Sequence, residues 1–510
     1  MTDILTALSL VLTFENFVAV LLGISLGVLL GAIPGLTADM AIALLIPFTF
    51  FLEPLTGMVA LMALAKGGTF GGSIPAILFN MPGTPQATAT CLDGHEMTKR
   101  GQGGKALRTA LYSSTSGDLF SDLVLLLVAA PLAAIALRIG PPEYAMIVLF
   151  SLVIIATSMG KHPLKAMLAV GIGLLLGTIG RDRFAYTERF TFGILELEDG
   201  IGLIPLLLGL LVLSEVFIQL RHREVTFKPN SKVLSQEELA AARFTFNDYR
   251  SLFKTILRSA ALGTGIGAIP GIGATVGAFL SYDVAKRTSK RPQEFGRGAM
   301  EGVAAPEAGN SAVQGANLIP LVTLGIPGSV VAALLLGAFM IHGMTPGPFL
   351  MRDQAPLLYA LFITLILSNL VLMLVGTVFI RLAAFVQMLP RATLFPLILL
   401  FCTIGAYAVS RSLFDVTLMF AFGVIGFAFR HVNIPVIPLV IAYFLGPMLE
   451  TAMRRSLLLS AGDVGIFVTR PISLVFLGLT VATLAVLFYR AYQARFTRRS
   501  SLPDDLEGGD

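Results

Sequence analysis

The chain has 510 residues, of which 55% are hydrophobic and only 13% are charged. Its mean hydropathy of +0.83 exceeds what a water-soluble fold of this length tolerates, so most of its surface must face lipid. The net charge of +5 lies mainly in loops, which fits the basic bias of cytoplasmic loops and argues against nucleic-acid binding. We therefore predict an all-α polytopic membrane protein.

Long uncharged segments recur along the chain, each near the length of a helix that crosses about 30 Å of hydrocarbon. The first segment lacks a basic leader and a small-residue cleavage site, so we interpret it as mature structure rather than a signal peptide. Cys91 and Cys402 lie far apart beside apolar sequence and predict neither a disulfide nor a metal framework. The uncharged segments cover residues 16–38, 144–160, 355–380, 392–410, 432–449 and 471–489.

The two halves of the chain resemble each other on either side of a polar segment. Three motifs recur in the same order at offsets of 236, 245 and 233 residues, which indicates an internal duplication. The pairs are GAIPGL at 31–36 with GAIPGI at 267–272, IPAILFNMPGT at 74–84 with IPLVTLGIPGS at 319–329, and IPLLLGLL at 204–211 with IPLVIAYF at 437–444. The predicted divisions are repeats at 1–220 and 255–450, a basic cytoplasmic linker at 221–254, and an extra C-terminal helix with a cytoplasmic tail at 451–510.

The basic residues predict that the two repeats insert with opposite orientation. Neither flank of the first GAIPG motif contains Lys or Arg, whereas both flanks of the second are basic. Each motif fits a re-entrant hairpin of two short half-helices, because Pro removes a hydrogen-bond donor and Gly admits the turn. Following the basic loops gives two hairpins and about eleven crossings, with the N-terminus periplasmic and the C-terminus cytoplasmic.

Two further segments, at 67–90 and 308–331, cannot be regular helices. In the first, Pro75, Pro82 and Pro85 each remove a donor, and each glycine costs about 1 kcal/mol. A break inside a membrane survives only in protein or beside a wet cavity, where it offers carbonyls to a cation and a helix N-terminus to an anion. Two facing broken helices are typical of alternating-access carriers. The alternative is that these residues merely kink helices and allow close packing.

Polar side chains beside the two breaks are the candidate ligand-binding residues, because they supply oxygens and donors without placing a full charge in lipid. Charged residues near apolar sequence form a second group, in which Lys66 attracts a carboxylate and Asp39 binds a cation, unless they reach the membrane interface instead. The neutral candidates are Ser73, Asn80, Thr84, Gln86, Thr88, Asn310, Ser311, Gln314, Asn317, Thr323 and Ser329, and the charged ones are Asp39, Lys66, Asp93, Glu301 and Glu307.

Several apparent motifs do not fit a catalytic or cofactor site. GTGIGAIPGIG lacks a surrounding βαβ unit, and GQGGKA lacks the spacing of a phosphate-binding loop. No HExxH or GxSxG motif occurs, so we predict no enzyme, no cofactor and no metal site other than one for a coupling Na⁺. Energy must then come from an ion gradient or a partner, and carbonyl-rich breaks with few buried acids favour Na⁺ over H⁺.

At these motifs the chain resembles the large membrane subunit, or permease, of the tripartite tricarboxylate transporters. The likeness spans roughly residues 15–490. Phe70 and His95 depart from the family pattern, which puts the substrate in doubt. The residues that carry the likeness are GAIPGLTADMAIALLIPFTF, GGSIPAILFNMPGTPQATATCLDGHEM, GAIPGIGATVGAFLSY, FGRGAMEGVAAPEAGNSAVQGANLIPLVTLGIPGS and GMTPGP.

The resemblance implies a secondary carrier in the bacterial inner membrane that imports carboxylates by symport with Na⁺ or H⁺. Its implied partners are a small four-helix membrane subunit and a periplasmic solute-binding protein, and its implied motion is of the elevator type. A stand-alone permease or channel for small organic anions, without a binding protein, is the alternative. The site residues carried over are Ser73, Asn80, Gly83, Thr84, Asn310, Ser311, Asn317, Gly328 and Ser329.

Overall fold

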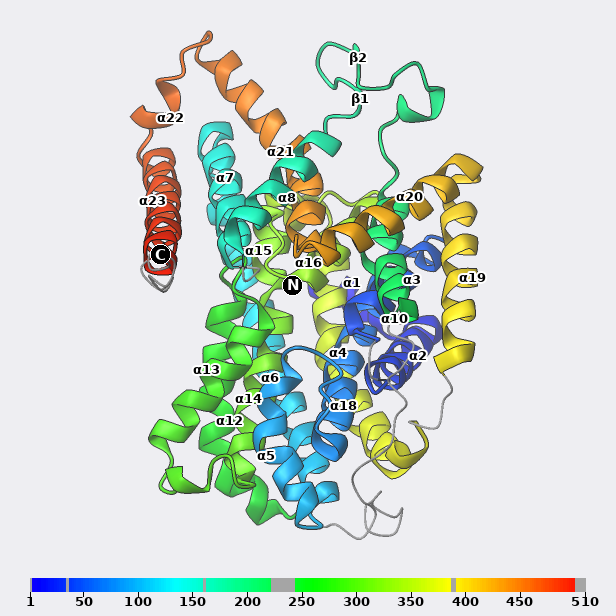
Figure 1. Ribbon diagram of the computed structural model, residues 1–510. Helices are drawn as coiled ribbons and strands as arrows, with labels where there is room; N and C mark the ends of the chain where they lie inside the picture. The colour runs from blue at the N-terminus through cyan, green and yellow to red at the C-terminus, as the bar shows by residue number, and fades with distance from the viewer. Residues whose placement is uncertain (1, 34–35, 159–161, 222–243, 387–390, 500–510) are drawn as a thin grey trace, which may run out of the picture. The chain divides into compact units, whose positions relative to one another are not determined.

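The computed structural model describes residues 2–33, 36–158, 162–221, 244–386 and 391–499 (Figure 1). Pro34 and Gly35 of the first predicted hairpin turn lie outside these residues, as does most of the predicted linker at 221–254. The described chain is helical apart from loops and one short antiparallel pair of strands, β1 (Gly180–Arg181) and β2 (Glu188–Arg189). The predicted all-α class is therefore confirmed.

The larger of two compact units comprises Met1–Arg138 and Thr178–Val432. It contains both GAIPG motifs and both predicted breaks. Its α-helices are α1 (Thr2–Val11), α2 (Phe14–Gly31), α3 (Ala38–Thr49), α4 (Pro54–Phe79), α5 (Ala87–Lys99), α6 (Gly103–Ala136), α9 (Leu203–Leu207), α10 (Ser214–Arg221), α12 (Phe246–Gly267), α13 (Gly273–Thr288), α14 (Met300–Ala316), α15 (Leu318–Leu324), α16 (Val330–Ile341), α17 (Pro348–Asp353), α18 (Ala355–Val386), α19 (Arg391–Ser410) and α20 (Leu413–His431).

Three shorter helical stretches complete this unit. Two are 3₁₀ turns, η1 (Leu195–Leu197) and η3 (Pro292–Glu294). The third, η2 (Leu208–Leu213), is a π-helical stretch that joins α9 to α10. A π-helix is rare and usually marks a local constraint, and here Gly209 lies against the backbone of α20, where a Cβ would come within 2.5 Å of the Met419 carbonyl oxygen.

The smaller unit comprises Ile139–Gly177 and Asn433–Asp510. Its helices are α7 (Pro141–Ser158), α8 (Pro163–Leu176), α21 (Val436–Leu459), α22 (Ile466–Thr469) and α23 (Pro471–Arg499). Helix α21 packs on both α7 and α8, and α23 packs on α7. An ion pair between Arg470 and Glu143 (3.2 Å) joins the start of α23 to the first turn of α7.

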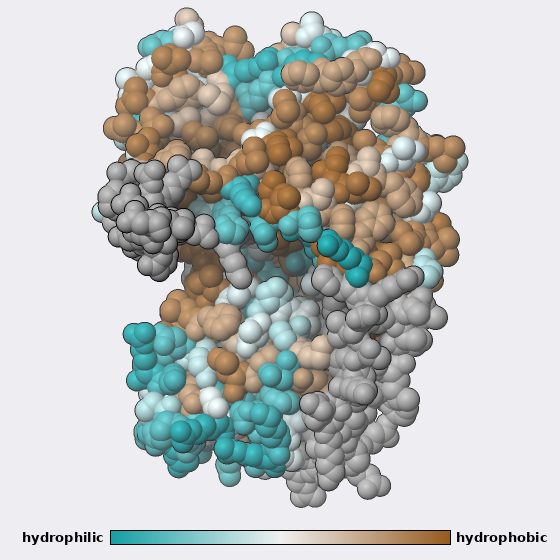
Figure 2. All heavy atoms as spheres, in the orientation of Figure 1, coloured by the Kyte–Doolittle hydropathy of each residue, from teal (hydrophilic) through white to brown (hydrophobic). Residues whose placement is uncertain are grey.

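Nine helices within the described ranges are long and apolar enough to cross a membrane. Four shorter apolar helices accompany them, among them α3 and α16. Large apolar side chains are exposed on several long helices, such as Leu374 on α18 (71% exposed) and Leu413 on α20 (75% exposed). In Figure 2, apolar side chains cover the region of α19 and α20, while hydrophilic side chains gather near the end of α13. This pattern confirms a multi-pass membrane protein.

The two GAIPG motifs join pairs of helices, α2 with α3 and α12 with α13. Helix α2 is capped by Thr13, whose hydroxyl accepts from the Asn16 amide, and α12 begins with a capping box of Thr245 and Asp248. In both pairs the first helix packs along the helix that precedes a predicted break, α2 on α4 and α12 on α14. Figure 1 shows α12, α13 and α14 beside α5 and α6.

Glycines allow the α2 and α4 backbones to approach closely. A Cβ on Gly31 would lie 2.5 Å from the Gly68 carbonyl oxygen, and a Cβ on Gly71 would lie 2.5 Å from the Val28 carbonyl oxygen. Real Cβ atoms do not come this close to backbone atoms, so no larger residue fits without separating the helices. Small residues at helix interfaces serve the same purpose in other membrane proteins.

Candidate functional site

The first predicted break follows α4. Asn80 adopts a left-handed conformation with a φ of 57°, which asparagine tolerates better than most residues that have a side chain. The Met81 amide donates to the Pro75 carbonyl (3.2 Å) and closes the helix end. Pro82 then lacks a donor of its own, and helical structure resumes only at Ala87. A short non-helical segment, residues 80–86, therefore separates α4 from α5.

Of the three prolines on which the predicted break rests, Pro75 does not interrupt the helix, because it lies within α4, which continues to Phe79. A single proline removes one intrahelical hydrogen bond, and the protein that buries α4 on all sides keeps the helix intact around that defect. The left-handed residue, and not the first proline, ends the helix.

The second predicted break has the same backbone pattern. Gly325 adopts the left-handed conformation with a φ of 70°, and the Ile326 amide donates to the Pro320 carbonyl (3.2 Å). Helix α16 follows, and the hydroxyl of Ser329 caps it by accepting from the Ala332 amide (3.2 Å). Both breaks thus contain one left-handed residue, and the amide of the next residue bonds back to a proline carbonyl.

Each break lies against the glycine motif of its own half of the chain. The Gly83 amide donates to the Gly72 carbonyl (3.1 Å), and a Cβ on Gly83 would lie 2.5 Å from the Gly31 carbonyl oxygen. In the second half, the Gly271 amide donates to the Gly328 carbonyl (3.0 Å). The predicted residues Gly83 and Gly328 therefore serve as points of close backbone contact.

Several polar groups beside the breaks are buried without a hydrogen-bond partner in the described structure. A buried polar group left unsatisfied costs about 1–3 kcal/mol, so a gathering of such groups indicates a place where a ligand supplies the partners. Asn317 lacks partners at both amide atoms, and its Oδ1 lies 2.7 Å from the Cβ position at Gly328. The predicted residues with such groups are Thr84, Asn310, Ser311 and Asn317, each at most 3% exposed.

Three other neutral candidates and the charged candidate Asp39 differ from this group. The side chains of Asn80 and Thr88 are exposed, so they do not share the buried environment of Asn317. Ser329 is engaged as the cap of α16. Asp39 lies in the first turn of α3 and is partly exposed.

Glu307, on α14, joins helices from the two halves. Its Oε1 accepts hydrogen bonds from the hydroxyls of Ser73 on α4 (2.5 Å) and Thr90 on α5 (2.5 Å), and its Oε2 accepts from Ser114 on α6 (2.7 Å). The carboxylate is fully buried. The structure therefore brings the predicted residues Ser73 and Glu307 together, with the three hydroxyls as the donors that satisfy the carboxylate.

Lys66 is buried in an ion pair. Its Nζ donates to Asp122 Oδ2 (2.5 Å), to the Leu365 carbonyl (3.0 Å) and to Asn369 Oδ1 (3.1 Å), so all three ammonium hydrogens have partners. Asn369 also donates to Asp122 Oδ2 (2.8 Å). A carboxylate ligand could engage Lys66 only by displacing one of these partners.

Two acids of this region, Asp118 and Asp122, were missed by the sequence analysis. Both lie on α6 and are at most 1% exposed. The signal was present, since acids inside an apolar helix are functional candidates by default. The hydroxyl-rich stretch YSSTSGDLFSD at 112–122 concealed it, because it made this part of the helix look polar throughout.

Asp93 has a different role from the other buried acids. Its Oδ1 accepts from the amides of Gly296 (2.9 Å), Gly298 (2.8 Å) and Ala299 (2.8 Å), and its Oδ2 accepts from the Tyr282 hydroxyl (2.8 Å). Four donors satisfy the charge. Asp93 thus fixes the loop before α14 to α5 and α13, which is a structural function.

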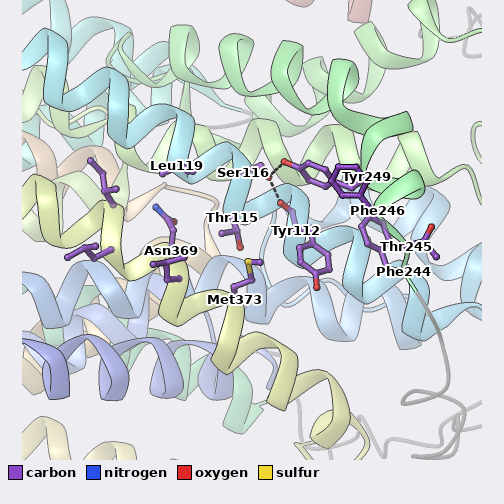
Figure 3. A pocket seen from close by; sticks show the side chains of 13 residues that line it. Tyr112, Thr115, Ser116, Leu119, Phe244, Thr245, Phe246, Tyr249, Asn369 and Met373 are labelled. Carbon is purple, nitrogen blue, oxygen red and sulfur yellow. Dashed lines mark hydrogen bonds between the residues drawn. The ribbon is translucent and has the colours of Figure 1, made fainter.

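A cavity of about 580 Å³ lies between α6, α18 and the start of α12 (Figure 3). Ser116, on α6, joins two parts of the cavity wall. Its hydroxyl donates to the Tyr112 carbonyl of the same helix (2.7 Å) and forms a hydrogen bond with the Tyr249 hydroxyl of α12 (2.9 Å). Among the described residues no Lys or Arg lines the cavity, so this part of its wall offers no opposite charge to a carboxylate. Its wall is mainly apolar and includes Tyr112, Phe244, Tyr249, Leu367 and Met373.

The fold and these sites define a polytopic, all-α membrane protein. Its interior holds two helix breaks with the same backbone pattern and buried polar groups that lack hydrogen-bond partners among the described residues. The model of the tripartite tricarboxylate transporter TctA family matches residues 17–441. The chain belongs to this family, as its motifs predicted, and the family is one of transport proteins and not of enzymes.

Two proteins of Agrobacterium vitis are similar to the chain. The "Uncharacterized 52.8 kDa protein in TAR-I ttuC' 3'region" is 38% identical over 497 residues, which cover 96% of this chain and 97% of that protein. The "Uncharacterized protein in TAR-II ttuC' 3'region" is 40% identical over 227 residues, which cover 44% of this chain and 94% of that protein. No solved structure matches the chain significantly.

Proposed function

We propose that the protein is the large permease subunit of a binding-protein-dependent secondary transporter that imports tricarboxylates or related carboxylates with Na⁺ or H⁺. The observation that carries this proposal is the pair of helix breaks with the same left-handed corner, beside which buried amide and hydroxyl groups lack partners. Membership of the tripartite tricarboxylate transporter family supports it.

The two halves act, in this proposal, as inverted repeats whose breaks approach the substrate from opposite sides. The unpaired amide of Asn317 and the hydroxyl of Thr84 donate to substrate carboxylates, because charged acceptors form the strongest hydrogen bonds with such groups. The N-terminus of α16, which follows the second break, adds the positive end of a helix dipole. Neutral donors can bind a carboxylate without a permanent charge in the membrane.

The proposed motion is of the elevator type. The packing of α2 on α4 and of α12 on α14 favours helices that move together with the breaks they support. The partners in this scheme are a small four-helix membrane subunit and a periplasmic solute-binding protein, and the chain lies in the bacterial inner membrane with its N-terminus periplasmic. The binding protein would deliver the carboxylate to the permease.

Reconstitution into proteoliposomes tests the proposal. Uptake of radiolabelled citrate or another tricarboxylate should require the small subunit, an added binding protein and an imposed cation gradient. Uptake by the permease alone would support the stand-alone alternative, and chemical conversion of the substrate would contradict a transport function altogether.

Variants of the two breaks test the site itself. Asn317→Ala removes both unpaired amide atoms, so uptake should fall to background while the melting temperature changes little, because no hydrogen bond in the described structure is lost.

Asn80→Ala should also abolish uptake. Asn80→Gly is its control, since glycine keeps the left-handed corner and removes only the amide. Uptake by Asn80→Gly would show that Asn80 acts through its left-handed backbone conformation and that its amide does not contact the substrate.

Uptake at the wild-type rate by Asn317→Ala would contradict the proposal that the substrate binds at the second break. Equal loss of uptake in Asn80→Ala and Asn80→Gly, with normal membrane insertion of both, would place the Asn80 amide in contact with the substrate. Uptake is best measured at several substrate concentrations, because a lost ligand contact raises the half-saturating concentration.

A further inference from the structure

Helices α6 and α14 pack against each other in a defined register. Ser114 donates to Glu307 (2.7 Å) at one position, and Gly117 lies in close contact with the carbonyl of Ala308 at the next. Further along, a Cβ on Gly315 would lie 2.8 Å from Asp122 Oδ1. These three contacts run in the same direction along both helices, so the stretches between them, which contain Asp118 and Ser311, face each other.

We call the contact between α6 and α14, from Ser114 and Glu307 to Asp122 and Gly315, the seam. Three oxygens in the seam are buried and lack a hydrogen-bond partner among the described residues. They are Asp118 Oδ1, Asp122 Oδ1 and Ser311 Oγ. Their residues are 1%, 0% and 1% exposed, so water does not reach them from the surface. Asp118 and Asp122 are four residues apart on one helix and therefore point to the same face.

The seam also has more negative than positive charge. The ammonium of Lys66 donates hydrogen bonds to Asp122 Oδ2, to the Leu365 carbonyl and to Asn369 Oδ1. It therefore neutralises one carboxylate, that of Asp122. Asp118 Oδ1 has no hydrogen-bond partner among the described residues, and within those residues no ion pair closer than 4.0 Å reaches Asp118. A buried charge without a partner is strongly unfavourable, which means that the pair of acids needs one more positive charge.

We propose that Asp118, Asp122 and Ser311 bind a Na⁺ ion in the seam between α6 and α14. Carboxylate and hydroxyl oxygens are the ligands that hard cations prefer. At the two aspartates, two carboxylates and one ammonium leave a single negative charge, which a monovalent cation neutralises. The third carboxylate of the seam, Glu307, accepts hydrogen bonds from Ser73, Thr90 and Ser114 instead. A proton would satisfy one carboxylate oxygen, whereas a metal ion satisfies all three unpaired oxygens together. The site rests on the proposed function, in which this ion is the coupling ion.

The position of the seam suits a coupling ion. Ser311 lies on the helix that leads to Asn317 and the second break, one and a half turns before its end. Ion binding between α6 and α14 would therefore fix the helix that presents the unpaired amide of Asn317. Ion and carboxylate binding would then favour each other, as coupled transport requires.

The test measures ion binding by the full chain purified in detergent, without partners or transport. Melting is followed with a thiol-reactive dye, because Cys91 and Cys402 are buried and react on unfolding. NaCl is titrated against choline chloride at constant ionic strength. The wild-type melting temperature should rise with Na⁺ and saturate, as expected for a ligand that binds only the folded state.

Three variants locate the ion. Asp118→Asn and Ser311→Ala should each raise the apparent Na⁺ dissociation constant by about tenfold or more, because each loses one ligand of the ion. Ser311→Ala is the milder change and keeps the test valid if Asp118→Asn does not fold. Glu301→Gln is the matched control, since this acid is on the same helix but is engaged with Thr255 and Ser289, and its Na⁺ response should be that of the wild type.

A wild-type Na⁺ response in both Asp118→Asn and Ser311→Ala would overturn the site. So would a wild-type protein that responds to pH but not to Na⁺, which would assign a proton to these acids. The outcome is separable from that of the proposed function. Na⁺ binding that depends on Asp118, in a protein that transports no carboxylate with its partners, would refute the carrier and leave the ion site standing.

Discussion

The buried pair of Lys66 and Asp122 allows a quantitative prediction. Replacing Lys66 by Met removes the cation and leaves Asp122 charged, 0% exposed, and bonded only through Asn369. Removing one partner of a buried ion pair costs about 3–5 kcal/mol, whereas replacing both charges is often close to neutral. The single variant should therefore be much less stable than the variant in which Asp122 is also changed to Asn.

The expected shift in melting temperature follows from the chain length. At about 2.1 cal/mol/K per residue, 510 residues have an unfolding entropy of about 1.1 kcal/mol/K. A loss of about 3–5 kcal/mol then lowers the melting temperature by about 3–5 °C. The measurement uses the thiol-reactive dye in choline chloride, so that Na⁺ does not neutralise the carboxylate left behind in Lys66→Met.

Two results would refute this reasoning. The first is a Lys66→Met protein that melts at the wild-type temperature, which would mean that the pair contributes nothing net. The second is a double variant no more stable than the single one, which would show that lost packing around the lysine side chain, and not the uncompensated charge, causes the destabilisation.

Two further predictions concern packing and the fixed loop before α14. Gly263→Ala places a Cβ against the Gly309 carbonyl and should lower stability by about 1–3 kcal/mol, whereas Gly265→Ala, in the same helix with no atom within 4 Å, should be neutral or stabilising in the same melting assay. Tyr282→Phe removes one of four donors to Asp93 and should cost about 1.5–3 kcal/mol. Equal melting of both glycine variants, or no change in Tyr282→Phe, would contradict these assignments.

The sequence predicted the parts of the site that depend on local chemistry. Its prolines and glycines predicted one break within residues 67–90 and another within 308–331, and the left-handed residues Asn80 and Gly325 lie inside these two segments. The role of Pro75 could not be predicted in the same way. Whether a proline breaks a helix or is absorbed depends on the surrounding packing, which local sequence does not specify.

Contacts between distant segments were beyond the sequence. Ser73 and Glu307 were both candidates, but nothing in their spacing indicated that one bonds to the other across 234 positions. The preference for Na⁺ rested partly on a scarcity of buried acids, and the fold instead buries Asp93, Asp118 and Asp122 together with Glu307. These acids lie on three helices, and only their packing shows which are satisfied by donors and which are not.

The contact between α2 and α4 constrains how this protein can move. Where Gly31 and Gly71 meet the opposite backbone, no side chain separates the two helices that could change rotamer and absorb a displacement. Interlocked backbones resist sliding, because any shift along the axis drives carbonyl oxygens into Cα atoms. A conformational cycle that repositions the first break must therefore move α2 together with α4. The hinges of such a motion lie outside the contact between these two helices.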